Sequence, residues 1–226
     1  MADAPLSPDE IIQRTVEHVR AVFAQDSSGH DWWHIYRVWQ VARVICAREG
    51  GDPFVVQMAA LLHDLDDYKL FPDADGTPRR ALAWMAQVGL DEAVTAHVRD
   101  IITGLSFKGA KVSDEMPTLE GKIVQDADRL DAIGAIGIAR AFAYGGHKGR
   151  ALYDPADAPT LYDDYEQYKQ NQSNTINHFY EKLLLLRDRI KTPTARQIAD
   201  QRHAFMEQFL AQFYKEWEGR DLDPAE

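Results

Sequence analysis

Two adjacent residues, His63 and Asp64, follow an apolar run and open a strongly acidic one. The run Ala60-Leu61-Leu62 is typical of a helix that goes into a protein core, yet the chain continues as His63-Asp64-Leu65-Asp66-Asp67. An ionised carboxylate beside an imidazole is costly to bury unless each group is paired or coordinates a cation. Neighbouring residues on a helix point about 100° apart, so both side chains reach one ion only if it lies at the helix surface between them. The abrupt change from apolar to acidic residues therefore indicates a buried ion pair or a metal site whose remaining ligands come from other helices.

Two other segments carry side chains that would complete such a metal site. His34 shares a helical stripe with Val38 and Ile45, so it is expected to point inward. Asp128 supplies a second acid in a segment, residues 123–131, where a predicted helix again mixes apolar and charged residues. Two imidazoles and two carboxylates make a shell of nitrogen and oxygen without sulfur. Such a shell suits one divalent ion, Mn²⁺, Fe²⁺, Co²⁺ or Ni²⁺, with Zn²⁺ as an alternative.

Helices are expected along the whole chain, because capping residues precede apolar positions spaced three and four residues apart. The expected ranges are residues 7 to about 24, 31 to about 48, 52 through 65 until a loop at 71–76 ends the helix, 77–89, 91 to about 105, 173–190 and 194–217. Residues 117–143 are read as one long helix or two abutting helices, interrupted by Gly134 and Gly137. No run of alternating β-branched and aromatic residues requires a sheet, so the predicted fold is all-α. The stretch 144–159, rich in Gly, Asp and Pro, is a candidate lid or binding loop.

Length and charge limit the class of protein. A chain of 226 residues, 45% of them hydrophobic, is expected to form one domain, residues 1–226. Lys and Arg total 25 against 36 Asp and Glu, which gives a formal net charge of −11. Most of the surface would repel a polyanionic duplex, so a nucleic-acid partner is not expected. A small phosphorylated substrate remains compatible, because a bound cation and a few local Lys or Arg residues can reverse the field inside one pocket.

Cysteine usage and hydropathy bear on the compartment. The single Cys46 has no partner in the chain, so neither a disulfide framework nor a cysteine-based zinc site is expected, and a reducing compartment fits best. The first ten residues contain three acids and no apolar run, and no uncharged stretch of 18 residues occurs. The chain is therefore predicted to be cytoplasmic and without a membrane partner. These features do not fix an oligomeric state.

The four candidate ligands resemble the H…HD…D signature of the HD superfamily of metal-dependent phosphohydrolases. Within it, the chain resembles bacterial HD-domain phosphohydrolases that include manganese-dependent nucleotide pyrophosphohydrolases. Four ordered blocks carry the resemblance and lie in a core of about residues 28–185; they are residues 30–38, 106–109, 125–135 and 177–183. The resemblance implies a helical HD domain with flanking terminal helices, metal-assisted hydrolysis of a phosphate ester or anhydride, and Mn²⁺ as the favoured ion.

The resemblance also implies which acid completes the metal site. Asp126 and Asp131 compete with Asp128 as the distal ligand, and the alignment of the signature favours Asp128. Asp131 lies three residues further on, nearly on the same face, where it either supports the site or caps a neighbouring helix. Arg37 and Arg129 are expected to pair with the acidic ligands.

Three residues are candidates for catalytic roles. Asp67 lies one helical turn beyond His63, so on a continuing helix it projects toward the same cavity and is placed to take a proton from water. It resembles the acidic position that related HD hydrolases use, but Asp66 is a rival and a solvated acidic helix end is the alternative. His30 is predicted to hold a phosphate or a water, or simply to start a helix.

Basic residues near the motifs are candidates for substrate binding, because a triphosphate needs several donors around its oxygens. The candidates are Lys108, Lys148, Arg150 and Lys182. Each has the alternative reading of a solvated surface charge, and Lys182 has the strongest claim because it lies inside a block that resembles the family.

These observations favour an enzyme that converts a nucleoside or deoxynucleoside triphosphate into a monophosphate and pyrophosphate. The alternatives within the enzyme class are a 5′-nucleotidase and a hydrolase of a guanosine alarmone. The alternative from another class is a helical module that senses metal and nucleotide without turnover. An intact set of four ligands argues against that last reading.

Overall fold

The computed structural model describes residues 6–24, 31–66, 77–105, 115–161 and 173–222. Within these ranges the secondary structure is helical and contains no strand, so the all-α prediction is confirmed. The helices are α1 (Pro8–Val22), α2 (Trp32–Glu49), α3 (Pro53–Leu62), α4 (Arg79–Gln87), α5 (Glu92–Gly104), α6 (Leu119–Asp131), α7 (Gly134–His147), α9 (Thr175–Glu181) and α10 (Pro193–Trp217), with the 3₁₀ turns η1 (Leu183–Arg189) and η2 (Arg220–Leu222).

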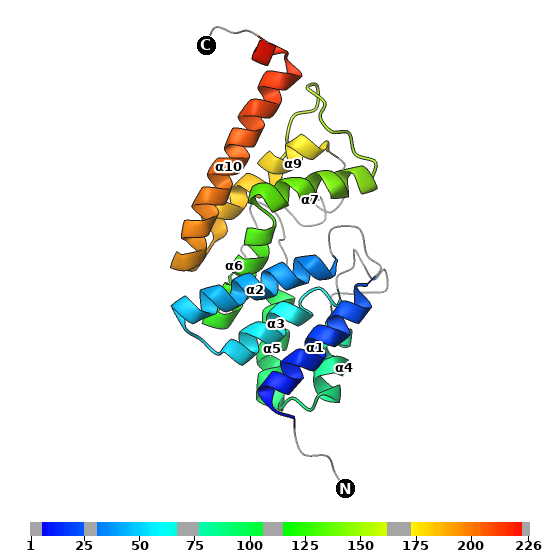
Figure 1. Cartoon of the computed structure of the whole chain (residues 1–226), viewed down its shortest axis with the longest axis vertical. Coiled ribbons are helices and arrows are strands. Elements are labelled where there is room, and N and C mark those ends of the chain that lie inside the picture. Colours follow the sequence, from blue (N-terminus) through cyan, green and yellow to red (C-terminus); the bar gives the residue numbers. More distant parts are fainter. Residues whose placement is uncertain (1–5, 25–30, 67–76, 106–114, 162–172, 223–226) are drawn as a thin grey trace.

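The helices form two groups that α6 joins. Figure 1 shows α1, α3, α4 and α5 together at the end of the molecule near the N-terminus, and α7, α9 and α10 at the other end. Helix α6 packs against α2, α3 and α5 on one side and against α10 and α7 on the other. Because α2 also contacts α3, α6 and α10, these helices provide the scaffold that positions the candidate ligands.

Side-chain caps set the starts of several helices at the positions that the sequence predicts. Ser7 and Glu10 form a capping box at the start of α1. The carboxylates of Asp31, Asp52 and Asp91 accept hydrogen bonds from the first free backbone N–H groups of α2, α3 and α5. Such caps satisfy donors that have no partner within the helix, which is why these boundaries are legible in the sequence.

Helix α3 is the most buried helix near the site. Val56, Met58, Ala59 and Leu61 have no exposed surface, because α1, α2, α5 and α6 surround the helix. The helix ends at Leu62 rather than continuing to Leu65 as expected, and residues 63–66 form turns. The His63-Asp64 pair therefore lies at the end of a core helix, not within it.

The stretch 117–143 forms two helices, and the glycines explain the break. The chain leaves α6 at Ala132, and Gly134 adopts a φ of 75°, which disfavours residues with a side chain. A Cβ at Gly137 would collide with the carbonyl oxygen of Ala132. The break thus needs a glycine at both positions, as their place in the sequence suggests.

Two further helix boundaries, after that of α3, differ from expectation. Helix α7 continues to His147, so the first residues of the predicted irregular stretch 144–159 are helical. The predicted helix 173–190 consists of the short α9 followed by η1, because Lys182 between them has a non-helical φ of −143°. None of the helices in the described part of the chain has the length and apolarity needed to cross a bilayer.

Candidate metal centre

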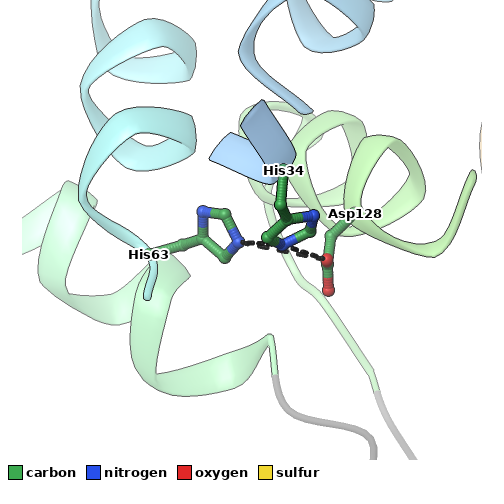
Figure 2. Close-up of side chains that lie close together, drawn as sticks. All are labelled: His34, His63 and Asp128. Carbon is green, nitrogen blue, oxygen red and sulfur yellow. Dashed lines mark hydrogen bonds and ion pairs between the residues drawn. The ribbon is translucent and has the colours of Figure 1, made fainter. Parts of the chain in front are cut away.

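Three packed elements bring His34, His63 and Asp128 together (Figure 2). His34 lies in the first turn of α2, where its backbone N–H donates to the Asp31 carboxylate at 3.0 Å. His63 follows the last residue of α3 in helical backbone conformation, and Asp128 lies in the last turn of α6. One nitrogen or oxygen atom from each side chain lies within 4.8 Å of the others.

The Nε2 atom of His34 is the centre of this cluster. It lies 3.3 Å from Nε2 of His63 and 3.5 Å from Oδ1 of Asp128. Nε2 of His63 lies 3.9 Å from the same Asp128 oxygen. Distances of this size are those expected between neighbouring ligand atoms of one ion, whose own bonds to nitrogen and oxygen are about 2.0–2.2 Å long.

Asp64 joins the cluster through both of its carboxylate oxygens. Oδ2 lies 3.3 Å from Nε2 of His34, and Oδ1 lies 3.4 Å from Nε2 of His63. The Asp64 side chain is only 11% exposed, so these oxygens face the imidazoles rather than solvent. All four predicted ligands thus converge, although the His-Asp pair does so from a turn.

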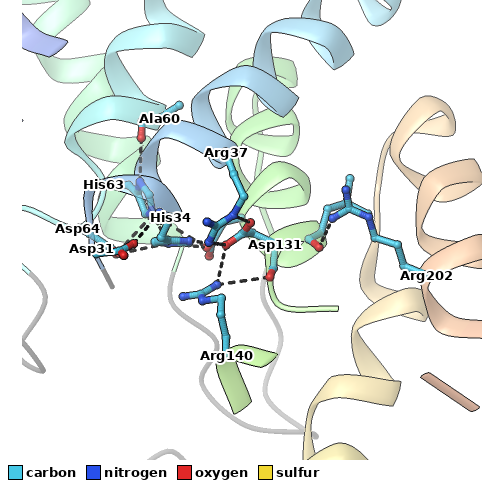
Figure 3. Close-up of polar contacts among 11 residues, drawn as sticks. Asp31, His34, Arg37, Ala60, His63, Asp64, Asp131, Arg140 and Arg202 are labelled. Atoms are coloured by element: carbon cyan, nitrogen blue, oxygen red, sulfur yellow. Dashed lines mark hydrogen bonds and ion pairs between the residues drawn. The ribbon is translucent and has the colours of Figure 1, made fainter. Parts of the chain in front are cut away.

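The other ring nitrogen of each histidine contacts a hydrogen-bond acceptor (Figure 3). Nδ1 of His63 lies 2.8 Å from the carbonyl oxygen of Ala60, which can only accept, so Nδ1 carries the proton. Nδ1 of His34 lies 2.7 Å from Oδ2 of Asp131. These partners assign the Nδ1–H tautomer to both rings and leave each Nε2 with a lone pair.

The cluster therefore consists of acceptors that face one another. Two imidazole lone pairs and two carboxylates repel unless a cation lies among them. Burial and the charge of Arg140 lower the pKa of His34, but hydrogen bonds to Asp131 and Asp64 outweigh them and raise this pKa above its ordinary value. The same negative field that favours a proton on His34 favours a metal ion, so the donor set fits a divalent cation.

The two rival aspartates lie elsewhere. Asp131 contacts His34 from the Nδ1 side, away from the cluster. Asp126 has no exposed surface, and its carboxylate accepts hydrogen bonds from the backbone N–H groups of Lys191 and Thr192 and from the Thr192 hydroxyl. Of the three aspartates on α6, only Asp128 faces both histidines.

Of the three catalytic candidates, Asp66 is the one that lies within the described residues, and it has a structural role. Its carboxylate accepts hydrogen bonds from the backbone N–H groups of Arg80 and Ala81, at 3.1 and 3.2 Å, and therefore holds the start of α4. Its role as a base stays a prediction. Asp67, His30 and Lys108 lie outside the described residues, and the continuous helix from which Asp67 was predicted to face the site stops at Leu62.

The remaining predicted substrate contacts lie beyond α7 and α9. Lys148 follows α7 and is exposed, and its Nζ lies 5.6 Å from the centre of the Tyr144 ring. The Arg150 guanidinium lies 5.8 Å from the same ring, and Lys182 is half-buried between α9 and η1. Their contact with a substrate stays a prediction.

One contributor was missed from the sequence, and Arg37 pairs with an acid other than the four candidate ligands. Arg140 on α7 donates to Oδ2 of Asp131 at 2.8 Å, across the break between α6 and α7. Nothing in the sequence pattern pairs these residues. Arg37 also contacts Asp131, which is not one of the four ligands, and Arg129 donates to the carbonyl oxygen of Arg189.

The fold is that of an HD domain. A model of this domain matches residues 32–133, a range that includes all four candidate ligand positions and lies inside the predicted core of residues 28–185. Together with the relatives below, this match shows that the chain belongs to the HD-domain superfamily and has the fold of its hydrolases. The prediction that residues 1–226 form a single domain stays a prediction.

Its relatives cover nearly the whole chain. YpgQ of Bacillus subtilis (strain 168) is 41% identical over 92% of this chain and 94% of its own length. The crystal structure of an HD-superfamily hydrolase from Bacillus thuringiensis is 43% identical, with a TM-score of 0.72, over 94% of this chain and 99% of that one. The structure of YpgQ in complex with ADP is 38% identical, also with a TM-score of 0.72, over 91% of this chain and 97% of that one.

Proposed function

We propose that the protein is a metal-dependent hydrolase of nucleoside or deoxynucleoside triphosphates that releases the monophosphate and pyrophosphate. The observation that carries the proposal is the group of four facing acceptors, His34, His63, Asp64 and Asp128, for which a divalent cation is the natural partner. A cation held there would activate water and neutralise charge on the departing group. Mn²⁺ is the proposed ion, because oxygen and nitrogen ligands without sulfur suit it.

The reaction is a displacement at the α-phosphorus. The oxygen of water forms a bond to this phosphorus, the bond to the bridging oxygen breaks, and pyrophosphate leaves with the electron pair. The water proton passes to Asp67 or Asp66. Asp66 would have to give up its hydrogen bonds to Arg80 and Ala81 in order to accept it, which favours Asp67. His30 holds a phosphate or a water.

Nucleotide binding is supported by the relative that was solved with ADP, because 91% of this chain aligns with it at 38% identity. ADP contains the same phosphoanhydride and nucleoside groups as the proposed substrates. The basic residues proposed to contact the phosphates are Lys108, Lys148, Arg150 and Lys182. The cytoplasmic location expected from the sequence also remains part of the proposal.

The proposal is tested with purified protein, freed of metal and then supplied with Mn²⁺, Co²⁺, Mg²⁺ or Zn²⁺. A panel of ribo- and deoxynucleoside triphosphates and guanosine alarmones serves as substrates, and pyrophosphate and phosphate are measured separately. Metal-dependent release of pyrophosphate from a nucleoside triphosphate supports the proposal, whereas its release from the alarmones alone would identify an alarmone hydrolase. Nucleoside 5′-monophosphates are included in the panel. Release of phosphate from them, without pyrophosphate from the triphosphates, would identify a 5′-nucleotidase instead, and nucleotide binding without turnover would identify a sensor.

Two isosteric variants distinguish loss of the metal site from loss of the fold. Asp64→Asn is expected to abolish turnover. Asp126→Asn should keep it, because the described hydrogen bonds of the Asp126 carboxylate go to the segment before α10. Asp67→Asn should lower kcat by about 10²–10⁴, the usual contribution of a general base, and leave metal affinity unchanged. Undiminished turnover by Asp64→Asn would refute the site.

A further inference from the structure

Asp131 is not one of the four candidate ligands, yet it contacts His34, Arg37 and Arg140. Its Oδ2 lies 2.7 Å from Nδ1 of His34 and accepts from Arg37 Nη2 at 3.0 Å and from Arg140 Nη1 at 2.8 Å. Its Oδ1 accepts from Arg37 Nε at 2.6 Å. The residue is only 4% exposed, and Figure 3 shows its contacts with His34, Arg37 and Arg140.

If Asp131 served only to join helices, its contacts with Arg37 and Arg140 would be enough, and no contact with His34 would be needed. The bidentate pair with Arg37 already joins α6 to α2, and Arg140 joins α7 to the same carboxylate. Asp126, five residues earlier on α6 and fully buried, shows what a structural carboxylate does on this helix, because it holds the backbone before α10. Asp131 in addition contacts the one ring nitrogen of His34 that faces away from the cluster.

The two arginines keep Asp131 ionised and oriented. Arg37 contacts both carboxylate oxygens of Asp131, and Arg140 contacts Oδ2. A carboxylate with both oxygens engaged cannot rotate away from the imidazole without breaking charge-assisted hydrogen bonds. It therefore presents a fixed acceptor to His34.

We infer that Asp131 is a positioning residue for metal binding, which fixes the ring orientation and the Nδ1–H tautomer of His34 so that Nε2 faces the cation. Arg37 and Arg140 act behind it by fixing the carboxylate. This inference rests on the metal binding of the proposed function and is independent of its substrate. Removing such a partner of a ligating histidine typically weakens metal affinity about 10–100-fold.

The test is a calorimetric titration of metal-free protein with Mn²⁺, without substrate. Asp131→Asn, which keeps the shape and removes the charge, should bind Mn²⁺ about 10–100-fold more weakly than the wild type. Asp126→Asn is the matched control, because it also neutralises a buried carboxylate on α6. The described hydrogen bonds of that carboxylate go to Lys191 and Thr192 and not to a histidine. Its affinity should stay within about twofold of the wild type, as expected for independent sites.

A second readout separates positioning from general loosening of the fold. In Zn²⁺-loaded, ¹⁵N-labelled wild-type protein, the Nδ1–H of His34 should give an exchange-protected ring resonance, assigned by its loss in His34→Gln. This resonance should vanish or shift strongly in Asp131→Asn and remain in Asp126→Asn. A resonance that is unchanged in Asp131→Asn would overturn the inference, because the proton would then not depend on Asp131.

Arg37→Gln keeps the inference testable if Asp131→Asn does not fold. It removes the bidentate donor from a partly exposed position and leaves the carboxylate in place, so the expected loss of Mn²⁺ affinity is about tenfold, at the lower end of the range. Wild-type affinity in the folded Asp131→Asn or Arg37→Gln protein overturns this inference alone. A wild-type protein that binds no divalent metal overturns the proposed function as well.

Discussion

Thermal stability offers a direct measure of the metal centre. A ligand that binds only the folded state stabilises it by RT ln(1 + [L]/Kd), which is about 2.7 kcal/mol when its concentration is about 100 times Kd. For a chain of 226 residues, an unfolding entropy of about 2.1 cal/mol/K per residue gives about 0.47 kcal/mol per kelvin. We therefore expect Mn²⁺ at this concentration to raise the Tm of metal-free protein by about 6 °C.

Asp64→Asn should remove nearly all of this increase. The carboxylate lies 3.3 and 3.4 Å from the two Nε2 atoms, so its loss takes away the ligand that contacts both imidazoles. If affinity falls by about 100-fold or more, the same Mn²⁺ concentration is at or below the new Kd, and the stabilisation falls to about 0.4 kcal/mol. The Tm should then rise by about 1 °C or less.

The assay is differential scanning calorimetry of chelator-treated protein, with Mn²⁺ added and then removed by excess chelator. Asp126→Asn serves as the control, since it should lower the Tm of the metal-free protein but keep the increase of about 6 °C. An equal increase in the wild type and Asp64→Asn would show that the metal binds elsewhere, and would refute the assignment of the four ligands.

Three further predictions concern the scaffold. Asp126→Ala should lower the free energy of unfolding in urea by roughly 3–5 kcal/mol, because it leaves the buried N–H and hydroxyl of Thr192 without their acceptor. Gly134→Ala should lower it by about 1–3 kcal/mol, because a φ of 75° strains a residue that has a Cβ. Hydrogen bonds from the Thr194 side chain and from its backbone N–H, the latter 2.7 Å long, lower the pKa of Glu49 in the folded state. A lowered carboxyl pKa contributes stability above the unfolded pKa, so the advantage of the wild type over Glu49→Gln should shrink as pH falls from about 6 to about 3.

Each of these predictions has a clear contrary result. A wild-type urea midpoint in Asp126→Ala would mean that α10 does not depend on this carboxylate for its start. Unchanged stability of Gly134→Ala would show that the break between α6 and α7 relaxes without strain. A difference between the wild type and Glu49→Gln that is independent of pH would exclude ionisation of Glu49 as its cause.

Three of the four candidate ligands, His34, His63 and Asp64, could be proposed from the sequence because each depends on a local signal. His34 follows a capping aspartate and shares the buried stripe of α2, and His63-Asp64 interrupts an apolar run. These signals do not need knowledge of which helices meet. The choice of Asp128 over Asp126 was less accessible, because both lie on a helix with few exposed positions and only the packing of α6 decides which one faces the histidines.

Features that depend on contacts between distant elements could not be predicted. The carboxylate of Asp131 meets Arg140 only because Gly134 turns the chain between α6 and α7. The glycines at 145 and 146 suggested a loop, yet α7 continues through them. A Cβ at Gly145 would collide with the hydroxyl of Thr175, so this glycine serves the close approach of α7 to α9 rather than a turn.

The wide separation of the ligands along the chain determines when a metal can be captured. His34 and His63 are 29 residues apart, and Asp128 lies much further along, so the open chain keeps only His63 and Asp64 of the four candidate ligands close together. A strong chelate appears only once α2, α3 and α6 have packed together. Uptake of the ion should therefore be among the last events of maturation, and the time course of Mn²⁺ capture during refolding reports directly on completion of the core.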